Sequence, residues 1–205
     1  MSLNSKVLEE ITSYFHSFPG IGKKTALRFT IQLMQQDDEF IRSFGQALVE
    51  LPTKIGECTQ CFNISELAVC EICSSKNRNA NIICVVQDIR DVIAIENTSQ
   101  FNGTYHVLGG VISPMDGIGP SDLKITQLFD RIEKDKEVAE IVLALPSTME
   151  GDTTSFYIFK KISSLSLKVS TIARGISFGD QIEYADELTL GKSILNRVLY
   201  DSENV

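Results

Sequence analysis

The spacing of apolar residues predicts that the chain begins with three short helices. Apolar residues recur every three or four positions before residue 16 and again between residues 26 and 34, and a third amphipathic stretch covers residues 39–49. Pro19, Gly20 and Gly22 separate the first two stretches, because proline and glycine interrupt helices. We therefore expect a small helical domain over residues 1–54 with a thin core.

A different pattern begins near residue 81, where runs rich in β-branched residues alternate with amphipathic stretches. The predicted strands cover residues 82–86, 105–108, 140–145 and 168–172, and the predicted helices cover residues 89–96, 121–132 and 153–162. Ser121 is the expected N-cap of the middle helix. Strand–helix–strand units connect through right-handed crossovers, so we expect a mixed, multidomain α/β chain with a mainly parallel sheet. A short helix over residues 188–200 is expected to close the chain.

Composition and charge exclude several classes of protein. Hydrophobic residues make up 43% of the 205 positions and charged residues 22%, which excludes global disorder. With 27 acidic and 19 basic residues the net charge is −8, so any nucleic-acid contact must be local. No apolar run approaches the roughly 20 residues that cross a bilayer, and residues 1–11 lack a secretory signal. We expect a cytoplasmic protein without membrane contact, whose thiols stay reduced.

The cysteines predict a structural metal site. Cys58, Cys61, Cys70 and Cys73 form two C-x2-C pairs separated by eight residues. Each pair presents two thiolates to one tetrahedral ion, and four soft ligands leave no open coordination position. We therefore expect one structural Zn²⁺ per chain, in a small module whose folding depends on the metal.

Two alternatives to zinc use the same cysteines. They can form disulfides or remain four unrelated buried thiols, which a reducing compartment and the double spacing disfavour. They can also hold an iron–sulfur cluster, which ranks below zinc. The fifth cysteine, Cys84, lies within the apolar run of residues 82–86 and is expected to pack in the core.

The glycine-rich turn between the first two helices is a candidate phosphate-binding site. Gly20 and Gly22 allow backbone N–H groups to approach a phosphate, and the N-terminus of the next helix adds its positive dipole end. Lys23 and Lys24 open that helix, and Arg28 lies on the same face as Lys24. The turn does not match a Walker A loop. It predicts a helix-hairpin-helix, which contacts DNA phosphates without reading bases.

The alternative for this turn is a plain helical corner with a solvated basic patch. A single hairpin makes only a few phosphate contacts, so it binds weakly. Useful affinity therefore requires several subunits on one nucleic acid.

Acidic residues follow the predicted strands of the α/β region. Asp91, Glu150 and Asp152 are placed near the carboxyl ends of strands, where working groups gather in parallel sheets. A Mg²⁺ site for phosphoryl transfer requires several converging carboxylates, but the first strand ends in the neutral amide of Gln87. Glu150 and Asp152 can instead simply stabilise the start of the next helix. Neither histidine forms part of a recognisable catalytic arrangement.

Taken in order, these motifs resemble the RecR family of bacterial recombination mediators. The resemblance covers nearly the whole chain and extends beyond the four cysteines. Its segments are FPGIG at 18–22, CFN at 61–63, ICVV at 83–86, YHVL at 105–108, SPMDGIGP at 113–120, EGD at 150–152 and IEYADELTLG at 182–191.

The resemblance implies four parts and a function. The parts are a helix-hairpin-helix domain (1–54), a zinc module (55–79), a Toprim domain (80–174) and a C-terminal segment (175–205) with a Walker-B-like loop and a closing helix. Members of the family form ring-shaped tetramers, or dimers, that encircle DNA without known catalytic chemistry. They bind gapped, single- and double-stranded DNA. With RecO and RecF they act at gaps, where they help RecA replace single-strand-binding protein on single-stranded DNA.

The resemblance also implies roles for particular residues. Lys24 and Arg28 match the DNA-contacting pair, and Lys23 is an additional base where the family often has proline. Asp91, Glu150 and Asp152 match the Toprim acids, in the region that meets RecO or controls DNA access. The hairpin and the C-terminal segment are implied to supply the subunit interfaces.

Two positions depart from the family pattern, and two other functions are compatible with the sequence. Gln87 replaces a glutamate that is frequent in Toprim domains, and Gly179-Asp180 replaces the usual Gly-Gly. One alternative function is a Mg²⁺-dependent Toprim nuclease or strand-passage enzyme that uses Glu150 and Asp152. The other is a zinc-stabilised scaffold that never touches DNA.

Overall fold

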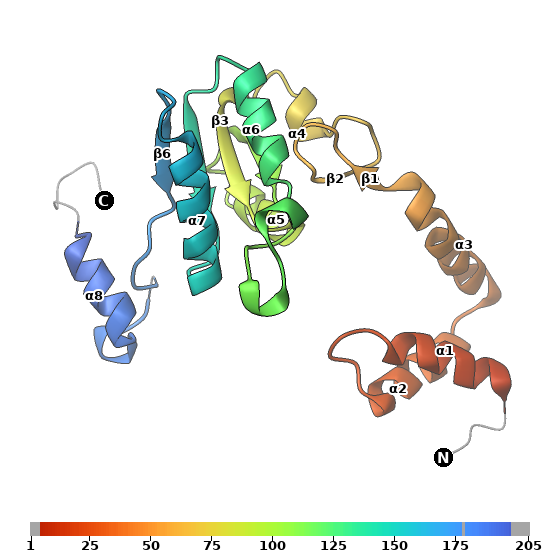
Figure 1. The fold of residues 1–205 in the computed structure, drawn as a ribbon. Helices are drawn as coiled ribbons and strands as arrows, with labels where there is room; N and C mark the ends of the chain where they lie inside the picture. The colour runs from red at the N-terminus through yellow and green to blue at the C-terminus, as the bar shows by residue number, and fades with distance from the viewer. Residues whose placement is uncertain (1–4, 178, 198–205) are drawn as a thin grey trace. The chain divides into compact units, whose positions relative to one another are not determined.

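The computed structural model describes residues 5–177 and 179–197, which divide into two compact units (Figure 1). The first unit ends at Gly56 and the second begins at Glu57. The first contains the helices α1 (Lys6–His16), α2 (Lys23–Met34) and α3 (Asp38–Lys54). The second contains a four-stranded sheet together with the cysteine-rich segment that precedes it.

Helices α1 and α2 pack against each other through a small interface. The Thr12 and Thr30 hydroxyl oxygens are 2.9 Å apart, and the rings of Phe15 and Phe29 meet edge to face with centroids 5.6 Å apart. Ala26 and Thr30 are the buried residues of α2. The third predicted helix is longer than expected, since α3 continues past Pro52 to Lys54.

The cysteine-rich segment is short and has little regular structure. It contains β1 (Gly56–Glu57), which pairs with β2 (Ile64–Ser65), and the single-turn helix α4 (Glu71–Ser74). Its buried residues are Cys58, Cys61 and Cys70, so its own apolar core is minimal.

The second unit confirms the predicted parallel α/β architecture. Its sheet has the strand order β4-β3-β5-β6, and all neighbouring strands are parallel. The strands are β3 (Asn79–Val86), β4 (Gly103–Val107), β5 (Glu140–Ala144) and β6 (Lys168–Thr171), and the helices are α5 (Ile89–Asn97), α6 (Ile125–Lys134) and α7 (Met149–Ile162). The chain then continues into a 3₁₀ turn (Ile182–Tyr184) and α8 (Glu187–Leu195). The predicted closing helix extended to residue 200, and residues 198–200 lie outside the described part of the chain.

The alternation of side chains along the central strands produces two cores. One face of β3 and β5 contributes Ile83, Val85, Ile141 and Leu143, which pack against α6 and α7. The opposite face of the sheet contributes Cys84, Val86, Tyr105 and Val107, which pack against Val92 of α5 and against the cysteine-rich segment. Cys84 therefore belongs to the core, as predicted.

The prediction that Ser121 is the N-cap of α6 is wrong. Residues 120–122 form a separate 3₁₀ turn, closed by the Gly119 N–H, which donates to Asp122 Oδ2 at 2.8 Å. Leu123 is then extended, so α6 cannot begin before Ile125.

Helix α7 begins four residues earlier than predicted, at Met149. Thr148 caps it, since its hydroxyl oxygen accepts a hydrogen bond from the Gly151 N–H at 3.2 Å. Glu150 and Asp152 consequently lie in the first turn of this helix, where the helix dipole stabilises negative charge. None of the helices within residues 5–177 and 179–197 is long and apolar enough to span a membrane.

Gly151 allows the start of α7 to approach the end of β5. A Cβ atom at this position would lie 2.0 Å from the backbone oxygen of Pro146. We therefore expect Gly151→Ala to lower the free energy of unfolding by on the order of 3 kcal/mol, because a backbone atom cannot move aside as a side chain does. Thr153→Ala, an exposed position on the same helix, is the matched control. Urea unfolding measures the stability of both variants. Equal stability would contradict the close approach assigned to Gly151.

Candidate metal centre and nucleic-acid interface

Two tight turns bring the four cysteines together. In the first turn, the Phe62 N–H donates to the Cys58 carbonyl at 3.0 Å, and Phe62 adopts a left-handed backbone with φ of 62°. In the second, Cys70 precedes α4 and the Ser74 N–H donates to its carbonyl at 3.0 Å. Each turn therefore directs its two sulfurs to the same point.

The sulfur positions fit one zinc ion. All four Sγ atoms lie within 4.8 Å of one another, and the Sγ atoms of Cys61 and Cys70 are 3.6 Å apart. A tetrahedron with Zn–S distances of about 2.3 Å has edges of roughly 3.8 Å, whereas a disulfide requires about 2.05 Å. All five cysteines of the described chain are free thiols. The site is therefore a four-cysteine centre for one zinc ion, and the disulfide alternative does not apply.

Backbone amides prepare this centre for negative charge. The Cys70 N–H donates to Cys58 Sγ at 3.3 Å, and the Cys73 N–H donates to Cys70 Sγ at 3.5 Å. Burial raises the pKa of Cys58, but N–H groups of Cys70, Cys61 and Gln60 outweigh it and lower that pKa to about 6. Such N–H···S contacts favour the thiolate form that binds metal.

The other sulfurs show why a cation is required. The hydrogen bond with Cys73, together with burial, raises the pKa of Cys61, and burial raises the pKa of Cys70 to about 11. Four thiolates so close together repel one another, and Zn²⁺ removes this repulsion. The ion would supply structural cross-linking here, because the four cysteines leave no coordination position for a substrate.

The cysteine-rich segment docks on the edge strand of the sheet. The Val107 N–H of β4 donates to the Cys61 carbonyl at 2.8 Å. The Phe62 ring meets the His106 ring edge to face with centroids 5.3 Å apart, and Lys124 Nζ lies 5.0 Å from the centroid of the Phe62 ring. Lys124 Nζ also pairs with Glu57 at 2.9 Å. The metal centre and the α/β region therefore share one interface.

His106 is buried and neutral in this interface. Burial lowers its pKa to about 4, although the Lys124 carbonyl, 2.8 Å from Nε2, opposes the shift. Because a carbonyl only accepts hydrogen bonds, Nε2 carries the proton. Nδ1 is the one buried side-chain nitrogen or oxygen without a hydrogen-bond partner among the described residues.

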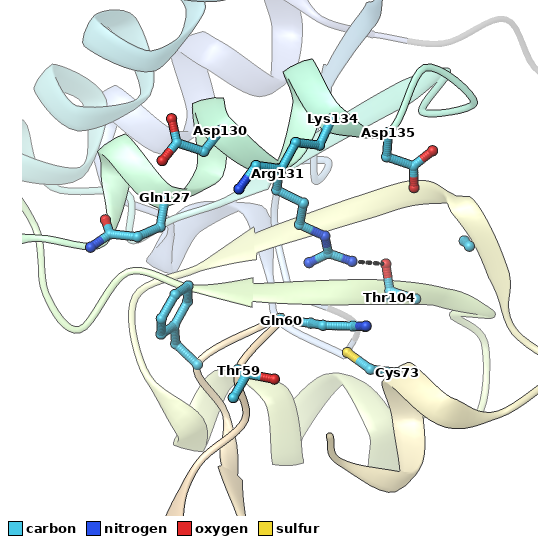
Figure 2. A pocket seen from close by; sticks show the side chains of 11 residues that line it. Thr59, Gln60, Cys73, Thr104, Gln127, Asp130, Arg131, Lys134 and Asp135 are labelled. Carbon is cyan, nitrogen blue, oxygen red and sulfur yellow. Dashed lines mark hydrogen bonds between the residues drawn. The ribbon is translucent and has the colours of Figure 1, made fainter. Parts of the chain in front are cut away.

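A cavity of about 520 Å³ lies beside the same interface (Figure 2). Thr59 and Gln60 line one side of it, and α6 lines the other with charged residues that include Asp130 and Lys134. Arg131 is fixed between them, since it donates to the Tyr105 carbonyl at 2.6 Å and to Thr104 Oγ1 at 2.9 Å. Sequence reasoning missed this cavity, because its lining comes from the cysteine-rich segment, β3, β4 and α6, which share no motif.

The glycine-rich turn has the geometry of a helical hairpin. Gly20 has a φ of +78°, a left-handed conformation that favours glycine. The Ile21 N–H donates to the Phe18 carbonyl at 3.1 Å, and His16 Nδ1 lies 2.9 Å from the Ile21 carbonyl. Gly22 is then the N-cap of α2.

The start of α2 presents positive charge to solvent. Lys23, Lys24 and Arg28 are exposed, and none of them forms an ion pair with another described residue. No acidic residue lies in the first turn of the helix. A Cβ atom at Gly20 or Gly22 would meet nothing within 4 Å, so the backbone is open to a ligand. This arrangement suits a phosphate group.

Asp91 serves its own helix. Its Oδ2 accepts the Gln87 N–H at 3.1 Å and the Asp88 N–H at 3.0 Å, which closes the capping box of α5. Gln87 thus contributes its backbone N–H to this turn.

Glu150 and Asp152 do not share the hydrogen-bond partners of Asp91. Asp152 Oδ1 accepts a hydrogen bond from Arg174 Nη1 at 2.7 Å. A metal site requires at least three acidic, histidine or cysteine side chains close together. In residues 5–177 and 179–197, the four cysteines are the only such group. The structure therefore does not bring the three predicted acids together as a cation site.

Four family models match the chain and together cover most of it. The RecR helix-hairpin-helix model matches residues 8–51, and the RecR zinc finger model, a domain with four cysteine ligands, matches residues 55–75. The Toprim domain matches residues 81–173, and the RecR C-terminal model matches residues 175–198.

Curated proteins resemble the chain over nearly its full length. Recombination protein RecR of Flavobacterium psychrophilum is 54% identical, over 98% of both chains. The protein of the same name from Porphyromonas gingivalis is 55% identical, over 94% of this chain and 93% of the relative. That of Phocaeicola vulgatus is 54% identical, over 96% and 95%.

The metal centre predicts a specific effect of removing one ligand. Cys61→Ser should abolish stoichiometric zinc binding and increase amide exchange over residues 57–75, because this segment lacks a sufficient apolar core. Cys84→Ser, which alters a buried cysteine outside the centre, should keep one zinc per chain. Metal analysis and hydrogen exchange test both expectations, and full zinc content in Cys61→Ser would refute the ligand assignment.

His106 predicts a pH dependence of stability. Its pKa of about 4 in the folded chain lies below the unfolded value of roughly 6.5. The unfolded chain therefore takes up a proton first as the pH falls, so the stability present above pH 6.5 is lost towards pH 4.

Between pH 7 and pH 5 the loss from His106 should be on the order of 2 kcal/mol. His106→Gln keeps an N–H donor but does not titrate, so its stability should fall less over this range. Urea unfolding with zinc in excess measures the difference, because metal effects are common to both proteins. Parallel pH profiles would show that His106 does not titrate in this way.

Proposed function

The chain belongs to the RecR family of recombination proteins, and from this premise we propose that it acts in recombinational DNA repair as a non-enzymatic DNA clamp. In this proposal it works with RecO and RecF to help load RecA on gapped single-stranded DNA. We infer four functional parts: the hairpin domain (1–54), the zinc module (55–79), the Toprim domain (80–174) and the C-terminal segment (175–205).

The exposed cationic start of α2 is the observation that carries this proposal. Residues 1–56 contain six basic and six acidic residues, so the whole net charge of −8 falls on the rest of the chain. Gly20, Gly22, Lys23, Lys24 and Arg28 therefore offer a local phosphate site on a chain that otherwise repels DNA.

Exposed apolar side chains favour assembly into a ring. Phe40, Phe44 and Leu48 are exposed on α3, and an open apolar groove of about 290 Å³ lies between Phe15, Phe29 and α3. Apolar surface of this kind marks protein interfaces. We propose that it and the C-terminal segment join identical subunits into a tetramer, or a dimer. Several hairpins on one DNA molecule then bind with a high effective concentration.

The acids of the Toprim domain support a recruiting role more than a catalytic one. Asp91 is used by its helix cap and Asp152 by Arg174, so neither carboxylate is shared with Glu150 around a common point. A nuclease of the Toprim type requires several carboxylates around Mg²⁺. We propose that Glu150 and Asp152, in the first turn of α7, contact RecO.

The proposed DNA site predicts the effect of removing two charges. Lys24→Ala combined with Arg28→Ala should weaken binding to gapped DNA on the order of tenfold or more, whatever its sequence. Each lost phosphate contact should also reduce the slope of log affinity against log salt by about 0.9. Fluorescence anisotropy at several salt concentrations measures both effects.

Lys136→Ala, which removes an exposed charge from the Toprim domain, is the matched control and should bind as the parent does. Unchanged binding by the double variant would place the DNA surface elsewhere. The mass in solution, with and without gapped DNA, tests the clamp itself. A chain that stays monomeric at every concentration, even with DNA, would contradict it.

A further inference from the structure

The four cysteines of the metal centre differ in their access to solvent. Cys58, Cys61 and Cys70 retain 0%, 1% and 4% of their accessible surface, whereas Cys73 is only partly buried. Cys73 also lines the cavity of about 520 Å³, on the wall opposite α6 (Figure 2). A small molecule that enters this cavity therefore reaches one of the four zinc ligands.

Cys70 also borders a cavity, of about 400 Å³, but it is better protected. Only 4% of its surface is exposed, and its sulfur accepts the Cys73 N–H at 3.5 Å. Cys58 Sγ likewise accepts the Cys70 N–H at 3.3 Å. Such hydrogen bonds make a thiolate a weaker nucleophile, and no backbone N–H in residues 5–177 and 179–197 donates to Cys73 Sγ. Access and reactivity therefore coincide at Cys73.

The lining of the larger of these two cavities suits a small, neutral, polar molecule. Thr59 and Gln60 offer hydroxyl and amide groups for hydrogen bonds. The charged side chains are two basic and two acidic ones, so they favour neither sign of charge: Arg131, Lys134, Asp130 and Asp135. Hydrogen peroxide is neutral and both donates and accepts hydrogen bonds, so it fits this lining.

The same cavity lies outside the surfaces proposed to join subunits. Its lining comes from the cysteine-rich segment, β3, β4 and α6 with the residue that follows this helix. None of the lining residues belongs to the hairpin domain or to the C-terminal segment. Assembly of a ring through those two parts therefore leaves the cavity open.

We propose that hydrogen peroxide enters this cavity and oxidises the zinc centre at Cys73, so that the zinc module is a reversible redox switch. Loss of the ion loosens the segment that covers β4. A thiol reductant followed by zinc restores the centre. The inference depends on the metal centre and goes beyond the DNA clamp.

The oxidation balances with peroxide as the only oxidant. The Cys73 thiolate attacks one oxygen of peroxide, the O–O bond breaks, and the sulfur becomes a sulfenic acid while hydroxide leaves and is protonated to water. The Cys61 thiolate, whose sulfur is in hydrogen-bond contact with that of Cys73, attacks the sulfenic sulfur. A disulfide forms and a second hydroxide leaves and is protonated. Two thiolates have lost two electrons to peroxide, and zinc, left with two ligands, dissociates.

Timed oxidation of the full, zinc-loaded chain tests where the reaction begins. Dimedone traps sulfenic acids for peptide mass spectrometry, and a chromogenic chelator reports released zinc. The first adduct should appear on Cys73, and release of one zinc per chain should follow together with a Cys61–Cys73 disulfide. A first adduct on Cys58, Cys61 or Cys70, or a centre that retains its zinc throughout, would overturn the inference.

Two ligand exchanges form a matched pair. Zinc also accepts three cysteines and one histidine, so Cys73→His should keep one zinc but release it on the order of tenfold more slowly in peroxide, because the exposed thiolate is gone. Cys58→His changes a fully buried ligand and should release zinc at the parent rate. Equal protection by both exchanges would refute the role of Cys73. If either variant does not retain zinc, the adduct order in the parent chain decides.

The route of entry has its own pair of variants. Gln60→Trp narrows the cavity that Cys73 lines, and should slow zinc release in peroxide. Glu66→Trp alters an exposed residue of the cavity beside Cys70, and should leave the rate unchanged. The reverse pattern would show that peroxide reaches the centre from the side of Cys70 and would overturn the inference.

Discussion

The convergence of four cysteine sulfurs on one point is the constraint on which the second unit depends. The sulfurs lie within 4.8 Å of one another in a segment that has almost no apolar core. A cation must therefore replace the missing hydrophobic stabilisation. The turn that carries Cys58 and Cys61 also positions Phe62 against His106 and places the Cys61 carbonyl on β4. The turn that would hold zinc through its sulfurs thus also covers one edge of the sheet through its backbone.

The two units differ in how their charges are distributed. The helical unit balances its acids and bases overall and gathers three cations around one helix start, without an acid in that first turn. The α/β unit carries the negative charge and uses several of its acids internally, in caps and ion pairs. A chain with an unfavourable net charge can in this way present a favourable local surface to a polyanion.

Local patterns in the sequence predicted most of the architecture and the metal centre. The spacing of the four cysteines fixes two turns that each span a few residues, so sequence alone identified the ligands. Alternating apolar runs likewise predicted all four strands of the parallel sheet. The error at Ser121 arose because Leu123 adopts an extended backbone, and neither propensity nor capping preference reports such a break. The pair of Asp152 with Arg174, 22 residues apart, depends on where β6 ends beside α7, which no local pattern encodes.

The position of the zinc module over β4 also determines what happens to the protein when the metal is lost. Strand β4 is an outer strand of the sheet, and its Val107 N–H is satisfied by the Cys61 carbonyl and by no neighbouring strand. When the metal is withdrawn, this cover loosens and the strand presents unpaired backbone groups, which are templates for strand addition between molecules. Zinc starvation is therefore expected to produce aggregates rather than a soluble unfolded chain, so the ion protects solubility as well as shape.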